Sequence, residues 1–195
     1  MDFKNVKYEK SFGTLAQLPP STMPEVAFIG RSNVGKSSLL NKLCGKKGLA
    51  GVSSKPGKTA TINFFKAGSA RLVDLPGYGF AQTSKKERER LGKLIEGYLS
   101  QDRNLVLVCS LIDIRHDATK LDVEMISFLR EAEVPFFVVL TKGDKLSKGK
   151  CAQQKAAIRK QLGIESDDQL MVTSSEKGTG INDLRQFINM MLGQE

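Results

Sequence analysis

One stretch of eight residues, Gly30-Arg31-Ser32-Asn33-Val34-Gly35-Lys36-Ser37, constrains this chain more than any other feature. It fits the pattern G-x-x-x-x-G-K-S, and it lies between a short apolar run at 26–29 and a helical pattern at 37–44. In that context the glycines let backbone amides curl around a phosphate, and the helix N-terminus adds positive potential. Lys36 is then expected to reach the β- and γ-phosphates, and the Ser37 hydroxyl to ligate Mg²⁺.

Apolar runs and helical patterns alternate after residue 24, which indicates an α/β fold with a mostly parallel sheet. Strands are expected at 26–29, 62–65, 70–73, 105–112, 136–140 and 170–172, with a tight turn at Gly68-Ser69. Helices are expected at 37–44, from Ser84 to Leu99, and around 121–132, 151–162 and 184–192. We therefore expect a three-layer domain at 24–195 with a six-stranded sheet, one antiparallel edge strand and helices on both faces. Residues 1–23 are expected to pack on it as an extension.

The charge of the chain favours polyanionic partners. Its 195 residues contain 30 Lys and Arg against 21 Asp and Glu, which gives a net charge of +9. Nucleic acid and a membrane surface both fit this charge, but the charge could also serve only solubility and the neutralisation of one bound anion. A hydrophobic fraction of 40% excludes a disordered tail, and residues 1–20 lack the apolar run of a secretory signal or a membrane span. The odd number of cysteines, three, indicates reduced thiols in a cytosolic protein.

A second motif, Thr141-Lys142-Gly143-Asp144, follows the expected strand at 136–140 and resembles the pattern [N/T]-K-x-D. A carboxylate can accept two hydrogen bonds from one edge of guanine, from its ring N–H and its exocyclic amine. Adenine offers no such pair of donors, so it would leave Asp144 desolvated and unpaired. The Lys142 stem is expected to lie along the face of the base. The two motifs together predict a site for GTP and GDP.

Three further segments are expected to complete this site. Asp74-Leu75-Pro76-Gly77 fits D-x-x-G, where Asp74 would hold Mg²⁺ through a water and the Gly77 amide would sense the γ-phosphate. Gly57-Lys58-Thr59-Ala60-Thr61 lies where a first switch segment belongs. One threonine there is expected to complete the Mg²⁺ shell, with Thr59 preferred and Thr61 as the alternative; the loop could also be merely polar. Thr173-Ser174-Ser175 follows the last expected strand and is expected to contact the guanine oxygen.

These motifs, in order from Gly30 to Glu176, resemble the Ras-like superfamily of P-loop GTPases. Four longer stretches resemble the EngB family of bacterial GTPases over nearly the whole chain: GRSNVGKSSLLN, SSKPGKTATINFF, DLPGYGFA and DIRHDATKLD. The resemblance implies a Ras-like fold and Mg²⁺-dependent GTP hydrolysis, with Lys36, Thr59 and Gly77 as catalytic candidates and Ser37 and Thr59 as metal ligands. It also implies a cytoplasmic protein that acts in assembly of the large ribosomal subunit on rRNA, and that is needed for normal cell division and septation. We expect a monomer without membrane insertion.

Several residues depart from the Ras-like pattern or have an open role. Tyr78 stands where a water-positioning glutamine would follow D-x-x-G, so unassisted hydrolysis is expected to be slow. Thr141 replaces the commoner asparagine and is expected to lose a tie between the base loop and the P-loop, which favours weak binding and fast exchange. Asn33 either forms a turn or helps to hold K⁺ beside the phosphates. His116, near Asp113 and Arg115, is expected to be a structural loop residue.

Basic residues lie in or next to both expected switch segments, where they either dock RNA or are simply solvated charges. They are Lys46, Lys47, Lys55 and Lys58 in the first, and Lys85, Lys86, Arg88, Arg90 and Lys93 after the second, where Lys86, Arg90 and Lys93 are expected to face solvent.

Besides a GTP-driven switch on the ribosome, two other functions are considered. The complete nucleotide set argues against an RNA-binding protein with a vestigial site. Asp144 and the absence of a recognisable lid segment argue against a P-loop kinase for a small molecule.

Overall fold

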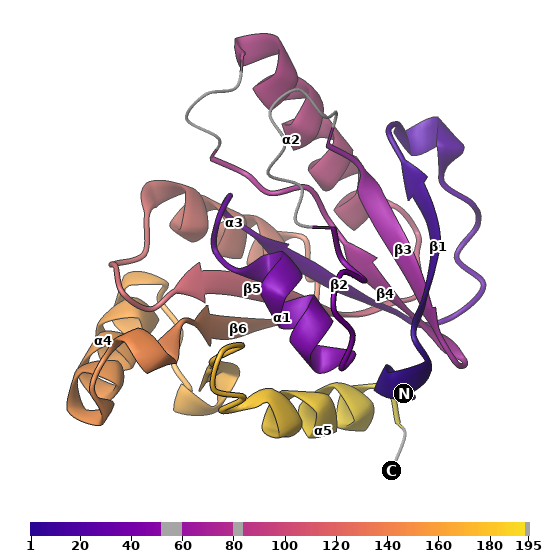
Figure 1. Cartoon of the computed structure of the whole chain (residues 1–195). Helices are drawn as coiled ribbons and strands as arrows, with labels where there is room; N and C mark the ends of the chain where they lie inside the picture. Colours follow the sequence, from indigo (N-terminus) through magenta and orange to yellow (C-terminus); the bar gives the residue numbers. More distant parts are fainter. Residues whose placement is uncertain (52–59, 80–83, 194–195) are drawn as a thin grey trace.

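The computed structural model describes residues 1–51, 60–79 and 84–193, which form three layers (Figure 1). In this described part, a seven-stranded sheet has the order β1-β3-β4-β2-β5-β6-β7. Its strands are β1 (Lys7–Phe12), β2 (Glu25–Gly30), β3 (Ile62–Ala67), β4 (Ala70–Asp74), β5 (Leu105–Asp113), β6 (Phe136–Thr141) and β7 (Leu170–Val172). The helices are α1 (Lys36–Leu43), α2 (Lys85–Ser100), α3 (Lys120–Glu131), α4 (Lys148–Gln161) and α5 (Ile181–Met191). The α/β fold class is confirmed.

Helices cover both faces of the sheet, as Figure 1 shows. On one face Leu40 of α1 and Leu184 of α5 belong to the same buried cluster as Phe28 of β2. On the other face α2, α3 and α4 bury residues such as Ile95, Ile126 and Ile158 in a second cluster. The central strand β2 is buried along its whole length, because a parallel strand between two helical layers has no solvent face.

The sheet differs from the expected one by an additional strand, since it has seven strands and not six. The N-terminal segment supplies it: β1 pairs antiparallel with β3, with Phe12 opposite Ile62. The sequence conceals this strand because Phe12 is the only buried residue of β1, so no apolar run marks it. Phe12 packs edge-on against Phe64 of β3, with ring centroids 4.9 Å apart. The boundary between an extension at 1–23 and a domain at 24–195 stays a prediction.

The antiparallel strand is also not at the edge. β3 runs antiparallel to β4 on one side and to β1 on the other, so it is the strand next to the edge. The remaining pairs, which β2, β4, β5, β6 and β7 form, are parallel. The carboxyl ends of these parallel strands lie at one edge of the sheet, which is where ligands bind in open α/β sheets.

A buried ion network joins β1 to the middle of the sheet. Glu25 of β2 is fully buried and accepts hydrogen bonds from Arg71 at 2.9 Å and from Arg103 at 2.8 Å. The Tyr98 hydroxyl of α2 donates to the same carboxylate at 2.8 Å. Arg71 also holds Glu9 of β1 through two hydrogen bonds of 2.9 Å. Burial alone would raise the pKa of Glu25, but its bonds to Arg103, Tyr98 and Arg71 outweigh that effect and lower the pKa.

Arg90 does not lie on the solvent face of α2, which is a correction to the expectation. Its guanidinium donates to the Gly13 carbonyl at 3.0 Å, to the Ala60 carbonyl at 2.8 Å and to Glu87. Arg90 therefore connects α2 to the N-terminal segment and to the strand entrance at residue 60. Lys86 and Lys93 are exposed, as expected.

No helix in the described ranges combines the length and the apolar character that crossing a membrane would need. Cys44, Cys109 and Cys151 are free thiols, the first two of them buried.

Candidate nucleotide-binding site

The P-loop connects β2 to α1 and forms a cradle of backbone amides. Asn33 and Gly35 have φ of 63° and 101°, which turn the chain sharply before the helix. Gly35 caps α1 without a side-chain hydrogen bond, so the first amides of the helix, from Lys36, have no partner within it. Only glycine fits at Gly30, because a Cβ there would lie 2.8 Å from the Leu111 carbonyl oxygen. This geometry fits a bound phosphate.

Three side chains at this cradle fit a magnesium-bound phosphate. Lys36 forms an ion pair with Asp74 at the end of β4. The Ser37 hydroxyl lies 3.2 Å from the Gly51 carbonyl oxygen, to which it donates. Hydroxyl and carboxylate oxygens are the donors that Mg²⁺ prefers, and the ammonium of Lys36 suits the phosphates. Ser37 and Asp74 would therefore hold the ion, with Lys36 on the phosphate side.

Asn63 of β3 is a residue that the sequence analysis missed. Its amide donates to the second carboxylate oxygen of Asp74 at 3.2 Å, and its side-chain oxygen accepts from Thr61 at 2.8 Å. Asn63 therefore orients Asp74 and connects it to Thr61. A polar residue within the apolar strand pattern of β3 was the available signal.

The expected first switch segment is described only at its end. Gly57, Lys58 and Thr59 lie outside the described residues, whereas Ala60 and Thr61 lie at the entrance to β3. The choice between Thr59 and Thr61 as a metal ligand stays a prediction.

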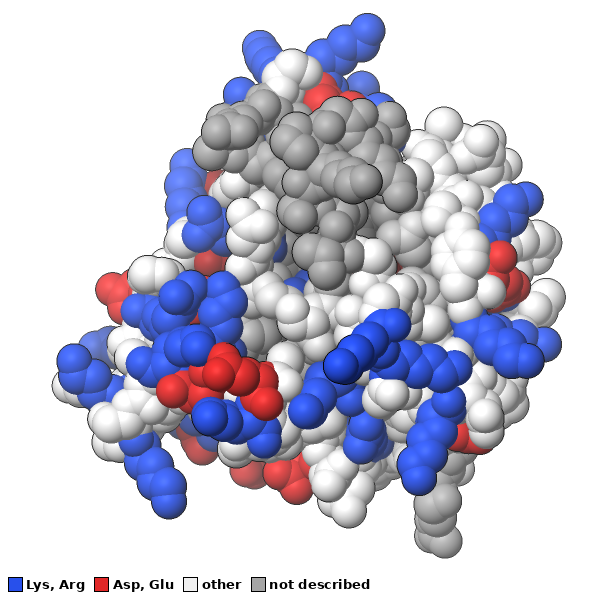
Figure 2. All heavy atoms as spheres, in the orientation of Figure 1, with Lys and Arg blue, Asp and Glu red and all other residues white. Residues whose placement is uncertain are grey.

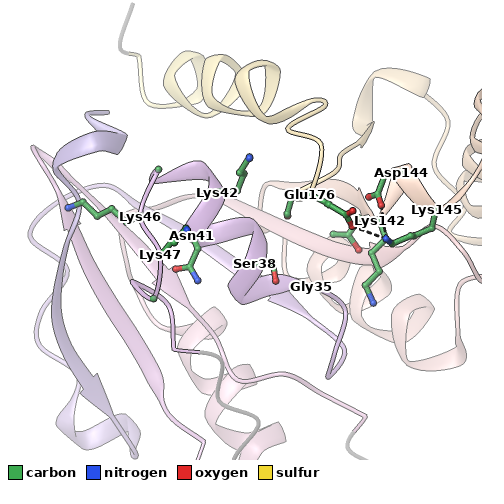
Figure 3. A pocket seen from close by; sticks show the side chains of 14 residues that line it. Gly35, Ser38, Asn41, Lys42, Lys46, Lys47, Lys142, Asp144, Lys145 and Glu176 are labelled. Carbon is green, nitrogen blue, oxygen red and sulfur yellow. Dashed lines mark hydrogen bonds and ion pairs between the residues drawn. The ribbon is translucent and has the colours of Figure 1, made fainter.

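Asp144 lines a cleft of about 710 Å³, which has Gly35, α1 and the loop after α1 on one side and the segments that follow β6 and β7 on the other (Figure 3). Its carboxylate accepts from the Ser174 hydroxyl at 2.6 Å and pairs with Lys145 at 3.1 Å. The Ser174 bond lowers the pKa of Asp144, with a further contribution from Lys145, so the group is an ionised acceptor. The Gly143 amide donates to the Thr173 carbonyl at 2.9 Å, which brings the two base-side segments together, and Ser175 lines the cleft.

Lys142 spans the distance between the base motif and the P-loop. Its ammonium donates to the Asn33 carbonyl at 2.8 Å and pairs with Asp113 at 2.9 Å. Burial alone would raise the pKa of Asp113, but hydrogen bonds from Arg115 and Lys142 outweigh it and lower the pKa. Asp113 thus positions the Lys142 side chain, a role that sequence reasoning missed. His116 is exposed beside it, and its amide donates to the Asp113 carbonyl in the turn.

Thr141 keeps a tie between the base loop and the P-loop, contrary to the expectation. The buried hydroxyl of Thr141 donates to the Val34 carbonyl at 2.7 Å. The threonine hydroxyl therefore connects the base loop to the P-loop, a connection that the sequence analysis expected only from an asparagine amide. The inference of weak binding from this replacement loses its structural basis.

Gly77 of the D-x-x-G segment lies directly against the P-loop. A Cβ at Gly77 would be 3.4 Å from the Gly30 oxygen and from the Ser32 nitrogen. Leu75, before it, is buried and donates its amide to the Phe28 carbonyl of β2 at 3.0 Å. Pro76 is buried as well. The segment is therefore fixed beside the phosphate cradle.

Comparison with known proteins identifies the family. A model described as a 50S ribosome-binding GTPase matches residues 25–142. A probable GTP-binding protein EngB of Streptococcus mutans is 49% identical over 165 residues, which are 84% of each chain. The chain belongs to the EngB family of GTP-binding proteins. A second EngB protein, from Streptococcus pneumoniae, is 43% identical over 180 residues, or 92% of each chain.

A solved structure agrees with this membership in EngB. The crystal structure of a probable GTP-binding protein EngB superposes with a TM-score of 0.75 at 25% identity, and the match covers 86% of this chain and 98% of that one. The chain is thus a P-loop GTPase that hydrolyses GTP.

Proposed function

We propose that this GTPase is a GTP-driven switch in assembly of the large ribosomal subunit, with rRNA as its partner, and that it is required for normal cell division and septation. The observation that carries the proposal is the match to a family model described as 50S ribosome-binding, over a chain with a net charge of +9. Figure 2 shows Lys and Arg side chains spread over the face that carries α1 and the P-loop. We further propose that the protein is a cytoplasmic monomer.

Within the site, each residue has a proposed role. Asp144 accepts from guanine, Lys142 lies along the base, and the segment Thr173-Ser174-Ser175 closes the cleft. Backbone amides from Asn33 to Ser37 and the Lys36 ammonium bind the phosphates. Ser37, a switch threonine and, through a water, Asp74 would hold Mg²⁺, which would supply positive charge to the phosphate oxygens. The Gly77 amide reports the γ-phosphate.

Hydrolysis is proposed to be slow without a partner. Tyr78 occupies the place of a water-orienting glutamine, and its hydroxyl donates to Asp122 at 2.8 Å, so it does not point to the phosphates. Positioning of the attacking water then falls to a partner or to a bound K⁺ ion. The Asn33 backbone adopts the left-handed conformation that suits an asparagine turn, so a role for Asn33 beside K⁺ stays a proposal.

The proposed partner is tested by pelleting large ribosomal subunits with protein loaded with GDP or with a non-hydrolysable GTP analogue. The wild type should pellet mainly with the analogue, because the γ-phosphate orders the switch segments. Reversing Lys86 and Lys93 to Glu should lower pelleting by about tenfold or more, since each exposed cation near RNA contributes phosphate contacts. Arg90 is left intact because of its structural bonds.

A matched control has the same net charge as the variant with Lys86 and Lys93 reversed. Reversing Lys148 and Lys150, two exposed lysines at the start of α4, changes the charge by the same amount on another helix. This variant should pellet as the wild type does. If both double variants lose binding equally, the attraction is non-specific, and if neither does, α2 is not the docking face.

A further inference from the structure

The Tyr78 side chain connects the D-x-x-G segment to helix α3. Its hydroxyl donates to an oxygen of Asp122 at 2.8 Å, and Asp122 is buried with 3% of its surface exposed. Burial, with the Asp122 carboxylate as a further cause, raises the pKa of Tyr78 well above its ordinary value, so the hydroxyl stays protonated and donates. A bond from a neutral donor to a buried carboxylate is stronger than a bond between neutral groups.

Asp122 is itself a fixed acceptor. Its other oxygen accepts from the amide of Thr119 at 2.8 Å and from the Thr119 hydroxyl at 2.7 Å, in the capping box that begins α3. The carboxylate therefore cannot follow the tyrosine if that ring moves away, because it would have to leave the helix cap.

The backbone of Tyr78 is bound to the P-loop at the same time. Its carbonyl accepts from the Ser32 amide at 2.9 Å and from the Ser32 hydroxyl at 3.2 Å. Its amide donates to the Gly30 carbonyl at 3.2 Å. Tyr78 is thus held by the P-loop through its main chain and by α3 through its side chain.

These bonds fix the residue next to Gly77. We propose that Tyr78 is a positioning residue: its hydrogen bond to Asp122 holds the Gly77 amide at the γ-phosphate position and so strengthens the binding of GTP relative to that of GDP. The inference rests on the proposed role of Gly77 as γ-phosphate sensor. GDP lacks the γ-phosphate, so a misplaced Gly77 amide weakens GTP binding selectively.

The test compares the affinities of fluorescent GDP and of a fluorescent non-hydrolysable GTP analogue. Tyr78→Phe should lower the affinity for the analogue about tenfold, in line with loss of one bond to a charged acceptor, and leave the affinity for GDP within about twofold. GTP turnover at saturation should fall as well. Equal changes in both affinities, or no change in either, would overturn the proposal.

Tyr98→Phe is a matched control. The Tyr98 hydroxyl also donates to a buried carboxylate at 2.8 Å, that of Glu25, but it lies in the ion network and not in the nucleotide site. This variant should lose stability and keep the wild-type ratio of the two affinities. A changed ratio in Tyr98→Phe would show that the ratio reports general loosening, and would overturn the proposal.

A double-variant cycle separates the bond from the fold. Asp122→Asn has a single acceptor oxygen, and when that oxygen keeps the helix cap at Thr119 its NH2 group faces the Tyr78 hydroxyl. The bond to a carboxylate is then lost, so the affinity ratio should approach that of Tyr78→Phe. The variant with both changes should have the ratio of Tyr78→Phe alone, because the two residues act through one bond. Additive losses would contradict the proposal. A Gly77→Ala variant, whose added Cβ would press on the P-loop, should also lower the affinity for the analogue relative to GDP, and a wild-type ratio in that variant would instead refute the role of Gly77.

Discussion

At the scale of the single residue, the choice of base is proposed to depend on Asp144. The side chain is held by Ser174 and Lys145, and its lowered pKa keeps it ionised. Asp144→Asn replaces one acceptor by a donor, so the affinity for GTP should fall about hundredfold and xanthosine triphosphate should become the better ligand. Competition between the two nucleotides for a fluorescent analogue measures the change.

Asp167→Asn is the matched control for that substitution, because Asp167 is an exposed carboxylate paired with Lys155 outside the site. It should leave both affinities as they are. An Asp144→Asn protein that still prefers GTP would remove the base assignment.

The residues of the site that sequence reasoning found are those whose chemistry is local in the chain. The P-loop and the base motif each combine their residue types within a few positions, directly after a strand. Asp113, Asn63 and the tie of Thr141 to Val34 are different, because their partners come from distant segments. Only the folded sheet brings these groups together, so the pattern of the chain alone did not reveal them.

At the scale of the element, the ion network around Glu25 makes β1 part of the sheet. Glu25→Gln leaves Arg71 and Arg103 without their shared buried carboxylate, which should lower the free energy of unfolding by about 3–5 kcal/mol. Glu9→Gln, at the partly exposed end of the same network, should cost only about 1 kcal/mol. Urea unfolding followed by circular dichroism measures both. Equal losses of unfolding free energy in the two variants would show that burial does not determine how much each carboxylate of the network contributes to stability.

The same network gives a pH dependence with a defined sign. The pKa of Glu25 is lower in the folded chain than its ordinary value of 4.5, so the folded state favours the ionised form. The stabilisation is therefore present above pH 4.5 and is lost as pH falls below it towards the folded-state pKa. Unfolding titrations should show a shallower acid limb in Glu25→Gln than in the wild type. An identical slope would mean that other carboxylates dominate this range.

Elements with an apolar face were predictable, and β1 was not. In α2 the residues Leu91, Leu94, Ile95, Tyr98 and Leu99 are buried at helical spacing, as the sequence predicts. β1 has four exposed residues in succession and is held by pairing with β3 and by Glu9. The solvent-facing position predicted for Arg90 was wrong for a related reason. Arg90 lies on the polar side of the helix, but the chain segments at Gly13 and Ala60 fold against its side chain.

At the scale of the whole molecule, the excess of positive charge predicts how the proposed binding to the large subunit should depend on salt. Each phosphate contact releases a counterion, so the logarithm of the binding constant should fall linearly with the logarithm of salt concentration, by about 0.7–0.9 for each contact. Replacing both Lys86 and Lys93 by Ala should make that slope shallower by the contribution of about two phosphate contacts. The Lys148→Ala and Lys150→Ala pair should leave the slope unchanged. Measuring pelleting with the GTP analogue over a series of KCl concentrations gives each slope. A slope that is the same in the wild type and in both variants would place the RNA contacts on another surface of the molecule.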